Sequence, residues 1–385
     1  MTEKLYYQNS RLARFSARVT ACEKTKDGWA ISLDKTAFFP EGGGQLADTG
    51  VIGAVRVTDV QERGGEIWHC TAAPLELGAE YACAIDAEQR RRRMQNHSGE
   101  HVVSGITHRL HGTNNVGFHM GGEFMTIDFD KELTWAQLME IERLANEAVR
   151  DNIPIKTWFP EPEELEALDY RSKLELTENV RIVEIAGIDT CACCAPHVAA
   201  TGEIGLIKVL DSMRHRGGVR ISLVCGMDAL DAVRVMQENV TAVSKVFSAP
   251  RNETGEAAAR FAAGEQKLKE RIAELSMAAV RMRAEATPEC AGNICVFDEL
   301  LDEVALRELV NQLSEKCTGY AAAFSGNDDE GYRYIIGSRH VDLKKRARDI
   351  NAGIDGRGGG RSEMLQGRAA KDAESIRKFI NSDNV

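Results

Sequence analysis

The stretch QNHSGEHVVSG, residues 95–105, decides how the middle of this chain folds. It places His97 and His101 four residues apart, followed by two valines. In a helix, residues i and i+4 lie one above the other on the same face, so both imidazoles can reach one point. Such a pair is a common half of a metal site. The alternative is two solvated or core histidines, and partners elsewhere in the sequence have to decide between the two.

Length and composition indicate a soluble protein of several domains. A chain of 385 residues is expected to form about two or three domains, because one core rarely grows past about 250–300 residues. Its 43% hydrophobic and 28% charged residues are typical of a globular protein. The first residues, MTEKLYYQNSRLARF, lack the apolar core of a signal peptide, and no run is long enough to span a bilayer. We therefore expect a cytoplasmic protein without a membrane partner.

Cysteine usage and charge narrow the class further. Ten cysteines spread over this length do not resemble a secreted disulfide framework, and the cluster CACC is better explained by metal binding or reactivity in a reducing compartment. The net charge of −11 argues against indiscriminate coating of nucleic acid. Between Arg333 and Lys378, however, 12 Lys and Arg stand against 6 Asp and Glu, and such a local basic patch can bind phosphates on an acidic protein.

Residues 1–90 carry short alternating segments such as RFSARVTAC, WAISLD and VRVTDVQ between Gly and Asp turns. This pattern predicts a small antiparallel β domain, most simply a barrel. Within it lies FFPEGGGQLADTG, residues 38–50, whose three successive glycines can adopt φ > 0 and let a ligand come close to the backbone. An ordinary glycine-rich hairpin turn is the alternative.

The rest of the chain predicts an α+β fold in three further parts. A second domain, residues 91–226, begins with the histidine helix and continues with a strand pair around FHMGGEFMTIDFD, the helix TWAQLMEIERLANEAVRDN and later strands. Residues 227–289 are rich in Ala, Glu, Arg and Lys and predict a long helical arm. Residues 290–385 alternate strands and helices around the loop IDGRGGGR, which indicates a C-terminal α/β module.

The histidine pair finds its partners in DTCACCAPHVAATGEIG, residues 189–205. Cys193 and His197 repeat the four-residue spacing, here in a stretch punctuated by Pro and Gly that should form a turn. One Cys and three His are a donor set that suits one Zn²⁺ per chain. The spacing selects Cys193 without excluding two rival sulfur ligands, Cys191 and Cys194.

Four protein ligands are typical of a closed, structural zinc site, whereas hydrolytic zinc usually keeps one position open. Three features favour a functional site nevertheless: the glycine-rich loop, a basic run at 90–93 that leads into the metal helix, and polar residues near the motifs, among them Gln45, Ser98 and Asn115. The basic run alone is equally well explained as a solvated face.

Four strings, FFPEGGGQLADTG, RMQNHSGEH, CxxxHVAATGEIG and IDGRGGGRSEMLQG, together resemble, in order and spacing, the editing domain and carboxy-terminal domain of alanyl-tRNA synthetases. The aminoacylation domain that would precede them is missing, so the chain resembles the long form of the free-standing alanyl-tRNA editing proteins. The resemblance covers nearly the whole chain. It implies an editing function for residues 91–226 and nucleic-acid binding for residues 290–385.

The resemblance implies hydrolysis of the ester in tRNA(Ala) mischarged with serine or glycine. It implies zinc ligation by His97, His101, Cys193 and His197. It also implies substrate binding by Gly42, Gly43 and Gly44 and by Arg357, Gly358, Gly359 and Gly360. Two departures stand out: Cys-Cys-Ala-Pro-His at 193–197 replaces the family's Cys-Gly-Gly-Thr-His, and Ser98 replaces threonine but keeps a hydroxyl.

A pocket with donors aimed at a serine hydroxyl discriminates against alanine, because alanine would leave those groups unpaired. Gln45, Ser98 and Asn115 are the candidates for this catalytic pocket. Two other functions stay open: a zinc hydrolase of another acyl ester, and a non-catalytic, zinc-stapled tRNA-binding protein. The heptad-like stripe of the arm also fits a homodimer interface, through the arm or the C-terminal domain.

Overall fold

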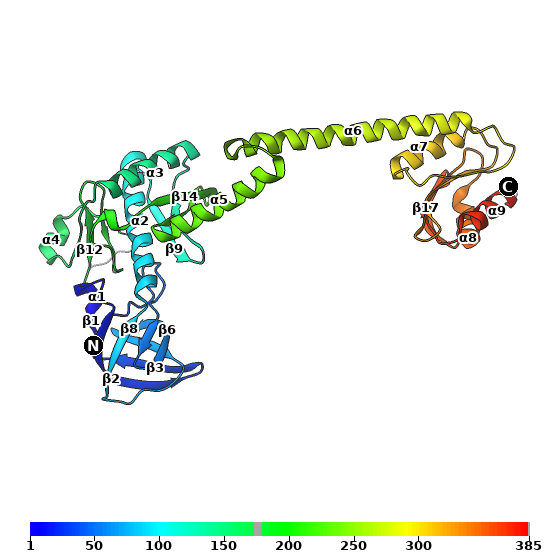
Figure 1. Ribbon diagram of the computed structural model, residues 1–385. Coiled ribbons are helices and arrows are strands. Elements are labelled where there is room, and N and C mark those ends of the chain that lie inside the picture. Colours follow the sequence, from blue (N-terminus) through cyan, green and yellow to red (C-terminus); the bar gives the residue numbers. More distant parts are fainter. Residues whose placement is uncertain (173–178, 384–385) are drawn as a thin grey trace. The chain divides into compact units, whose positions relative to one another are not determined.

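The computed structural model describes residues 1–172 and 179–383. The chain divides into two compact units, Met1–Ala242 and Val243–Val385, and the division falls within one helix. Figure 1 shows the order of the elements along the chain. The predicted fold class, α+β, is confirmed.

The first unit begins with strands that pair into a closed barrel in the order β2-β3-β7-β6-β5-β8. The helix α1 (Leu5–Gln8) and the strand β1 (Glu3–Lys4) precede the barrel strands in sequence. Strand β1 pairs parallel with β4 (Lys35–Thr36), which lies between β3 and β5. Alternate residues point inward along each strand and form an apolar core that includes Val19, Ile31 and Val60. The barrel strands are β2 (Arg14–Thr25), β3 (Gly28–Leu33), β5 (Gly50–Ile52), β6 (Val55–Arg63), β7 (Glu66–Thr71) and β8 (Glu80–Ile85).

Helix α2 (Ala87–His111) leaves the barrel directly after β8. It begins where the Asp86 side chain accepts a hydrogen bond from the Gln89 backbone, and it ends at Gly112 in the left-handed conformation with φ 58°. Every residue from Met94 to Thr107 is buried. Because neighbours surround this helix, polar residues on it have to find partners inside the protein.

Two sheets and a helix surround α2 (Figure 1). One sheet has the strand order β14-β15-β10-β9 and the other the order β11-β12-β13. Helix α3 begins with a capping box between Thr134 and Gln137 and buries Leu138, Ile141 and Ala145 in the common core. The elements are β9 (Asn115–Gly121), β10 (Phe124–Phe129), α3 (Trp135–Arg150), β11 (Ile155–Trp158), α4 (Pro162–Ala167), β12 (Ile182–Ile185), β13 (Asp189–Ala192), η1 (Thr201–Glu203), β14 (Ile207–His215) and β15 (Gly218–Cys225).

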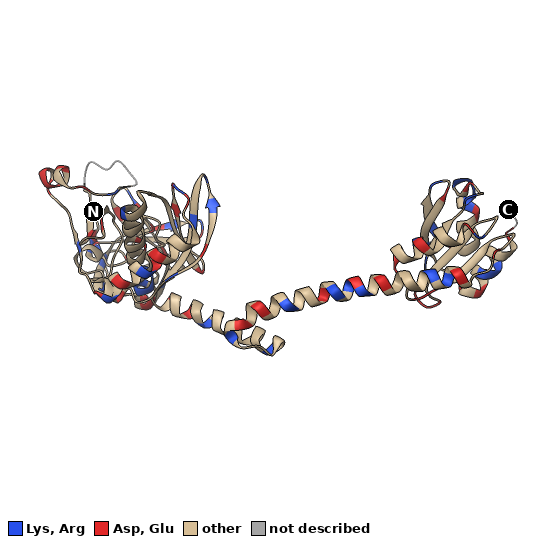
Figure 2. Ribbon diagram, turned by 90° about the horizontal axis from the view of Figure 1, so that it is seen from above, with Lys and Arg blue, Asp and Glu red and all other residues tan. Residues whose placement is uncertain are grey.

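The predicted helical arm, residues 227–289, contains two helices. Helix α5 (Met227–Phe247) and helix α6 (Thr254–Ala286) are separated by Ser248, which has φ 50°, and by Pro250, before η2 (Arg251–Glu253). Proline lacks the N–H that the helix ladder needs, so the chain turns at this point. Charges of both signs alternate along α6 (Figure 2), as expected for a solvated helix surface.

The second unit ends in a five-stranded sheet of order β16-β17-β18-β20-β19. Helix α7 and the end of α6 pack on one face around Leu306 and Leu309, while α8 and α9 pack on the other around Ile350 and Ile376. The elements are β16 (Ile294–Phe297), α7 (Glu303–Leu313), β17 (Ala321–Asn327), β18 (Gly331–Gly337), α8 (Leu343–Ile354), β19 (Gly356–Gly360), β20 (Met364–Ala369) and α9 (Ala373–Ser382).

The glycine segment of this module is a strand and not the predicted loop. Strand β19 pairs antiparallel with β20 over its whole length. A Cβ atom on Gly358 would lie 2.3 Å from both the Gln366 carbonyl oxygen and the Tyr334 hydroxyl. Glycine is therefore present because the neighbouring chain comes too close for a side chain.

Among the helices that the structure describes, none combines the length and the apolar composition needed to cross a bilayer.

His69 makes the stability of the barrel dependent on pH. Its side chain is fully buried on β7, with Nδ1 2.9 Å from the Ile31 carbonyl oxygen and Nε2 2.9 Å from the Thr36 hydroxyl. Burial lowers the pKa of His69 to about 4, whereas the unfolded chain has an ordinary histidine pKa of about 6.5. As pH falls from about 6.5 to 4, the unfolded state takes up a proton that the folded state refuses, and about 3 kcal/mol of stability is lost.

Between pH 7 and pH 4, we predict that the free energy of unfolding falls by about 3 kcal/mol less in His69→Gln than in the parent, because glutamine does not titrate. Urea unfolding followed by tryptophan fluorescence measures this, since all four tryptophans (Trp29, Trp68, Trp135 and Trp158) lie in the first unit. Comparing the two proteins at both pH values cancels the other titrating groups. An equal loss in both would contradict the assignment.

Candidate metal centre

Four side chains from two segments converge on one point. His97 and His101 lie on α2, and Cys193 and His197 lie in the irregular segment that follows β13. Their ligand atoms all lie within 4.8 Å of one another. Cys193 Sγ is 3.5 Å from His97 Nε2 and 3.4 Å from His197 Nε2. A tetrahedral ion with bonds of about 2.3 Å to sulfur and 2.0–2.1 Å to nitrogen would separate these atoms by about 3.6 Å, so the cluster is of the right size for a metal ion.

Each histidine is held through its other ring nitrogen. His97 Nδ1 is 3.0 Å from Gln45 Oε1, His101 Nδ1 is 2.9 Å from Asp189 Oδ2, and His197 Nδ1 is 3.1 Å from Ser98 Oγ. Gln45 Oε1 and Asp189 Oδ2 are acceptors, so Nδ1 of His97 and of His101 carries a proton, and the Nε2 atom of each ring is the one directed at the cluster. Such a second layer of contacts is typical of metal-binding histidines.

The protonation of the cluster also suits metal binding. Burial lowers the pKa of His197 to about 3, so this imidazole is neutral. Burial raises the pKa of Cys193, but the neighbouring His97 and His197 outweigh it and hold that pKa well below its usual value. Burial lowers the pKa of His101, but the Glu100 carboxylate and the Asp189 hydrogen bond outweigh it and raise that pKa well above its usual value. The proton shared between His101 and the Cys193 thiolate is the one that a bound cation would displace.

Asp189 stays charged beside His101. Burial raises its pKa, but hydrogen bonds from His101 and Arg171 outweigh this and keep the pKa below the usual value. Arg171 makes a two-pronged contact with the carboxylate, at 2.7 Å from Nε to Oδ1 and 2.8 Å from Nη2 to Oδ2. The charged Asp189 therefore makes His101 a stronger electron donor.

The glycine-rich loop lies against the cluster. Gly42 and Gln45 exchange two backbone hydrogen bonds, of 3.1 and 3.0 Å, and close a tight turn in which Gly43 has φ 60° and Gly44 has φ 82°. A Cβ atom on Gly43 would lie 3.5 Å from Cys194 Sγ, and one on Gly44 would lie 2.6 Å from the Phe118 ring. The Phe118 ring in turn lies 4.9 Å from the His97 ring. The loop and the metal cluster thus form one site.

The three residues predicted to line the catalytic pocket have different surroundings. Ser98 is fully buried, and its Oγ accepts from the Val198 backbone in addition to contacting His197. Asn115 is buried under α2 and donates to Glu100 and to Ser104. Gln45 is fully buried as well, and its Nε2 has no hydrogen-bond partner among the described residues.

Sequence reasoning gave no specific role to Asp189, Glu100 or Tyr6. Asp189 begins the same cysteine-rich string that supplied Cys193, and Glu100 lies between the two histidines, but a carboxylate at these positions does not by itself indicate a role. Glu100 Oε2 lies 3.7 Å from His101 Nε2. Tyr6 is 1% exposed and packs on Phe39 and Ala195, and its hydroxyl has no hydrogen-bond partner among the described residues.

The structure also separates the rival residues. Cys193 is the sulfur that joins all three histidines, while Cys191 groups with His101 and Asp189, and Cys194 is exposed beside the glycine loop.

In the basic run, Arg90 forms a buried ion pair with Asp48, Arg92 pairs with Asp228 and Asp231, and Arg93 donates to the Ala47 carbonyl. Three of its four arginines thus have structural partners.

The candidate substrate-binding residues near the C-terminus belong to the second unit. Arg357, Gly358, Gly359 and Gly360 form β19, an edge strand, and all four are exposed. Gly359 and Gly360 also border a surface cavity of about 440 Å³ together with Arg307, Arg339 and Arg361. Exposed backbone N–H groups and arginines are suited to phosphate contacts.

Two family models match the chain. Residues 180–222, which include Cys193 and His197, match the Threonyl and Alanyl tRNA synthetase second additional domain. Residues 291–383, which include β19, match the DHHA1 domain. The chain is also 31% identical over 240 residues to the alanyl-tRNA editing protein AlaX-L of Pyrococcus horikoshii, which covers 60% of this chain and 59% of that protein. Over more than half of its length, the chain is thus similar to an alanyl-tRNA editing protein.

The chain is also similar to alanyl-tRNA synthetases. The alanine–tRNA ligase of Natronomonas pharaonis is 31% identical over 369 residues, which is 90% of this chain and 39% of that enzyme. The chain thus spans about two fifths to three fifths of the curated relatives described here. Among solved structures, the C-Ala domain from Aquifex aeolicus alanyl-tRNA synthetase matches 25% of this chain and 99% of that domain at 22% identity and a TM-score of 0.21.

We predict that Asp189→Asn weakens the binding of a divalent metal ion by about 10- to 100-fold, because His101 loses its charged partner. Competition with a coloured chelator measures the affinity. Asp27→Asn, in an exposed turn of the barrel, is the matched control and should bind like the parent. Equal affinity of Asp189→Asn and the parent, both folded by circular dichroism, would show that the cluster does not hold the metal through His101.

Proposed function

We propose that this chain is a Zn²⁺-dependent hydrolase that releases the amino acid from mischarged Ser-tRNA(Ala), and from Gly-tRNA(Ala), in the cytoplasm. The observation that carries the proposal is the cluster of His97, His101, Cys193 and His197, with each histidine oriented by a second residue. The similarity to the protein named alanyl-tRNA editing protein AlaX-L supports the substrate class.

Zinc is the metal that best fits this donor set. One thiolate and three neutral imidazoles are the borderline-soft ligands that Zn²⁺ prefers, and their size and geometry suit a tetrahedral ion. When bound, the ion would supply a fixed positive charge that anchors or polarises a substrate group. The rest of the chemistry then depends on the side chains around it.

An aminoacyl ester is already activated, so the protein chiefly has to hold it, polarise its carbonyl and supply a water. The ligand histidines are 2–3% exposed. We assign substrate binding to the glycine-rich loop beside them, Gly42, Gly43 and Gly44. Glu100 is 3% exposed and lies beside His101, where its carboxylate is placed to accept a proton from an attacking water.

Gln45 is the residue that we assign to substrate recognition. The hydrogen bonds of Ser98 and Asn115 are directed at His197, Glu100 and Ser104, so these two side chains act as positioning residues. Gln45 Oε1 orients His97, and its Nε2 is left as a buried donor with no partner among the described residues. A serine hydroxyl satisfies this donor, whereas alanine leaves it unpaired, and glycine is accepted only because it is small.

The second unit is proposed to bind the RNA. The exposed edge β19 with Arg357, and the neighbouring Arg361, offer phosphate contacts that position tRNA without reading its sequence.

We further propose a homodimer through α6. Its apolar stripe, Phe261, Leu268, Ile272 and Leu275, is 54–66% exposed and is spaced as in a coiled coil. Sedimentation equilibrium of the full chain, which gives its mass in solution, tests this part of the proposal.

We predict that the intact protein deacylates Ser-tRNA(Ala) rapidly and spares Ala-tRNA(Ala), and that Cys193→Ala loses both bound zinc and this activity. Release of labelled amino acid and metal analysis of the same samples measure both. Cys194→Ala is the matched control, because its sulfur is exposed and outside the cluster, and it should keep zinc and activity.

The same assay separates the rival functions. A folded, zinc-loaded protein that releases no serine would be a zinc-stapled RNA-binding protein. A protein that cleaves simple acyl esters as fast as Ser-tRNA(Ala) would be a hydrolase of another substrate.

We predict that the pair of changes Arg357→Ala and Arg361→Ala raises KM for Ser-tRNA(Ala) by about 10-fold and leaves kcat unchanged, because phosphate contacts are lost while the reacting group is untouched. The effect should shrink at high salt, since screening weakens phosphate contacts. Lys24→Ala together with Lys26→Ala, on the barrel, removes as much charge and is the control. An unchanged KM would remove β19 from the RNA contact.

A further inference from the structure

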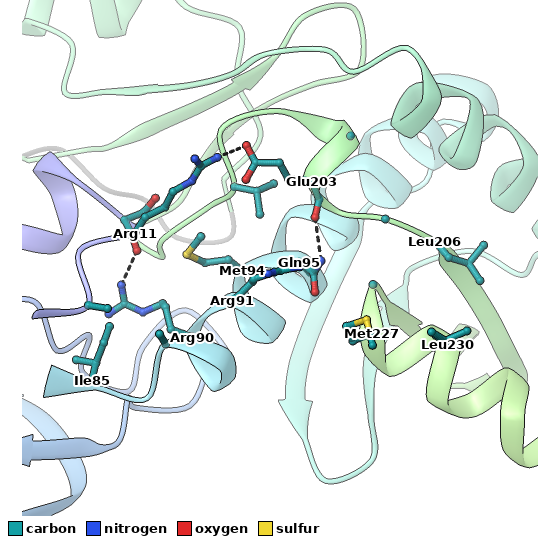
Figure 3. A pocket seen from close by; sticks show the side chains of 17 residues that line it. Arg11, Ile85, Arg90, Arg91, Met94, Gln95, Glu203, Leu206, Met227 and Leu230 are labelled. Atoms are coloured by element: carbon teal, nitrogen blue, oxygen red, sulfur yellow. Dashed lines mark hydrogen bonds and ion pairs between the residues drawn. The ribbon is translucent and has the colours of Figure 1, made fainter.

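A separate cavity lies within the first unit, and none of the four candidate metal ligands lines it. It has a volume of about 960 Å³. Its walls come from the N-terminal segment at Arg11, the first turns of α2, the segment around η1, and the start of α5 (Figure 3). Neither the glycine-rich loop nor any residue assigned to the proposed hydrolysis borders it. Its role is therefore open.

Gln95 presents an unused hydrogen-bond acceptor in this cavity. The side chain is 5% exposed, and its Nε2 donates to the Glu203 carbonyl oxygen at 2.9 Å (Figure 3). Its Oε1 has no hydrogen-bond partner among the described residues. The orientation of the amide is fixed, because a flipped amide would place two oxygens against each other. Gly226 lies directly against this buried oxygen: a Cβ atom there would come within 2.3 Å of it, so only glycine fits beside the acceptor.

The cavity also has one free cation. Arg90 donates to Asp48 and to the carbonyl oxygens of Ser10 and Ala37, and Arg11 pairs with Glu203. Arg91 is exposed, and among the residues that the structure describes it has neither a hydrogen bond nor an ion pair. Its guanidinium is thus available to an anion at the rim of the cavity.

The remaining wall is apolar. Met94 and Met227 border the cavity together with Leu230 (Figure 3). Thioether and branched aliphatic side chains pack well on a flat ring. A ligand that satisfies all three features has a flat apolar body, an N–H donor on its edge and a negative charge at its end.

We propose that this cavity binds an adenine nucleotide. The base packs between the methionines and Leu230, its exocyclic amino group donates to Gln95 Oε1, and its phosphate binds Arg91. Without a donor, the buried acceptor would stay unpaired, so the amino group is recognised and not merely tolerated. The site shares no residue with the metal centre, so it stands or falls independently of the hydrolysis proposed above. The nucleotide is either free or part of an RNA strand.

The test is calorimetric titration of the full-length, zinc-loaded protein with AMP. One AMP per chain is expected to bind. Purine riboside 5′-monophosphate, which lacks the amino group, should bind at least about 5-fold more weakly, as should adenosine, which lacks the phosphate. Arg91→Met should lower AMP affinity about 5-fold and leave adenosine binding unchanged. Arg56→Met, also an exposed arginine, on β6, is the control.

A blocking variant keeps the proposal falsifiable even if changes at Gln95 disturb folding. Leu230→Trp fills the cavity from a residue that is 39% exposed, and Leu77→Trp, 67% exposed on the barrel, is its control. Loss of AMP binding only in Leu230→Trp supports the site. Failure of the parent to bind AMP saturably, or unchanged binding in Leu230→Trp, overturns it.

The source of the nucleotide is decided by a second titration. A 5′-phosphorylated oligoadenylate that binds at least 10-fold tighter than AMP identifies an RNA strand as the ligand. Equal or weaker binding of the oligoadenylate identifies a free mononucleotide.

Discussion

The buried ion pair between Arg90 and Asp48 is the interaction on which the first unit depends. Both side chains are 2–3% exposed, so neither charge is tolerable without the other. Asp48 also accepts a hydrogen bond from the Phe39 backbone, and Arg90 donates to the Ser10 and Ala37 carbonyl oxygens. One guanidinium thus fixes the N-terminal segment and the glycine-rich loop to α2, two turns before His97. The candidate metal ligands and the glycine-rich loop come into register for this reason.

The sequence predicted the metal cluster because its ligands follow a local rule. Spacing of four residues on a helix places His97 and His101 on one face, and the repeat at Cys193 and His197 supplied the other half. The partner of His101 could not be predicted in the same way, because Asp189 is 88 residues away and only tertiary packing brings it close. Nothing in the local pattern distinguishes it from other carboxylates.

One error of the sequence-based prediction has a local physical cause. The segment at Gly358 was predicted as a loop because a run of glycines usually forms turns. Here the glycines make room for β20 and for Tyr334, a contact that is only visible in the folded sheet.

The buried polar atoms of the first unit that lack a hydrogen-bond partner lie at two places. Buried polar groups are normally paired, so each exception requires an explanation. Among the described side chains of this unit, the unpaired atoms belong to Tyr6, Gln45 and Gln95. The first two lie around the metal cluster and the third lies in the cavity beside α5. His97 and His101 lie on the same helix as Gln95, and both have a hydrogen-bond partner for Nδ1. A ligand that supplies a donor therefore explains the unpaired Gln95 Oε1 better than an accident of folding does.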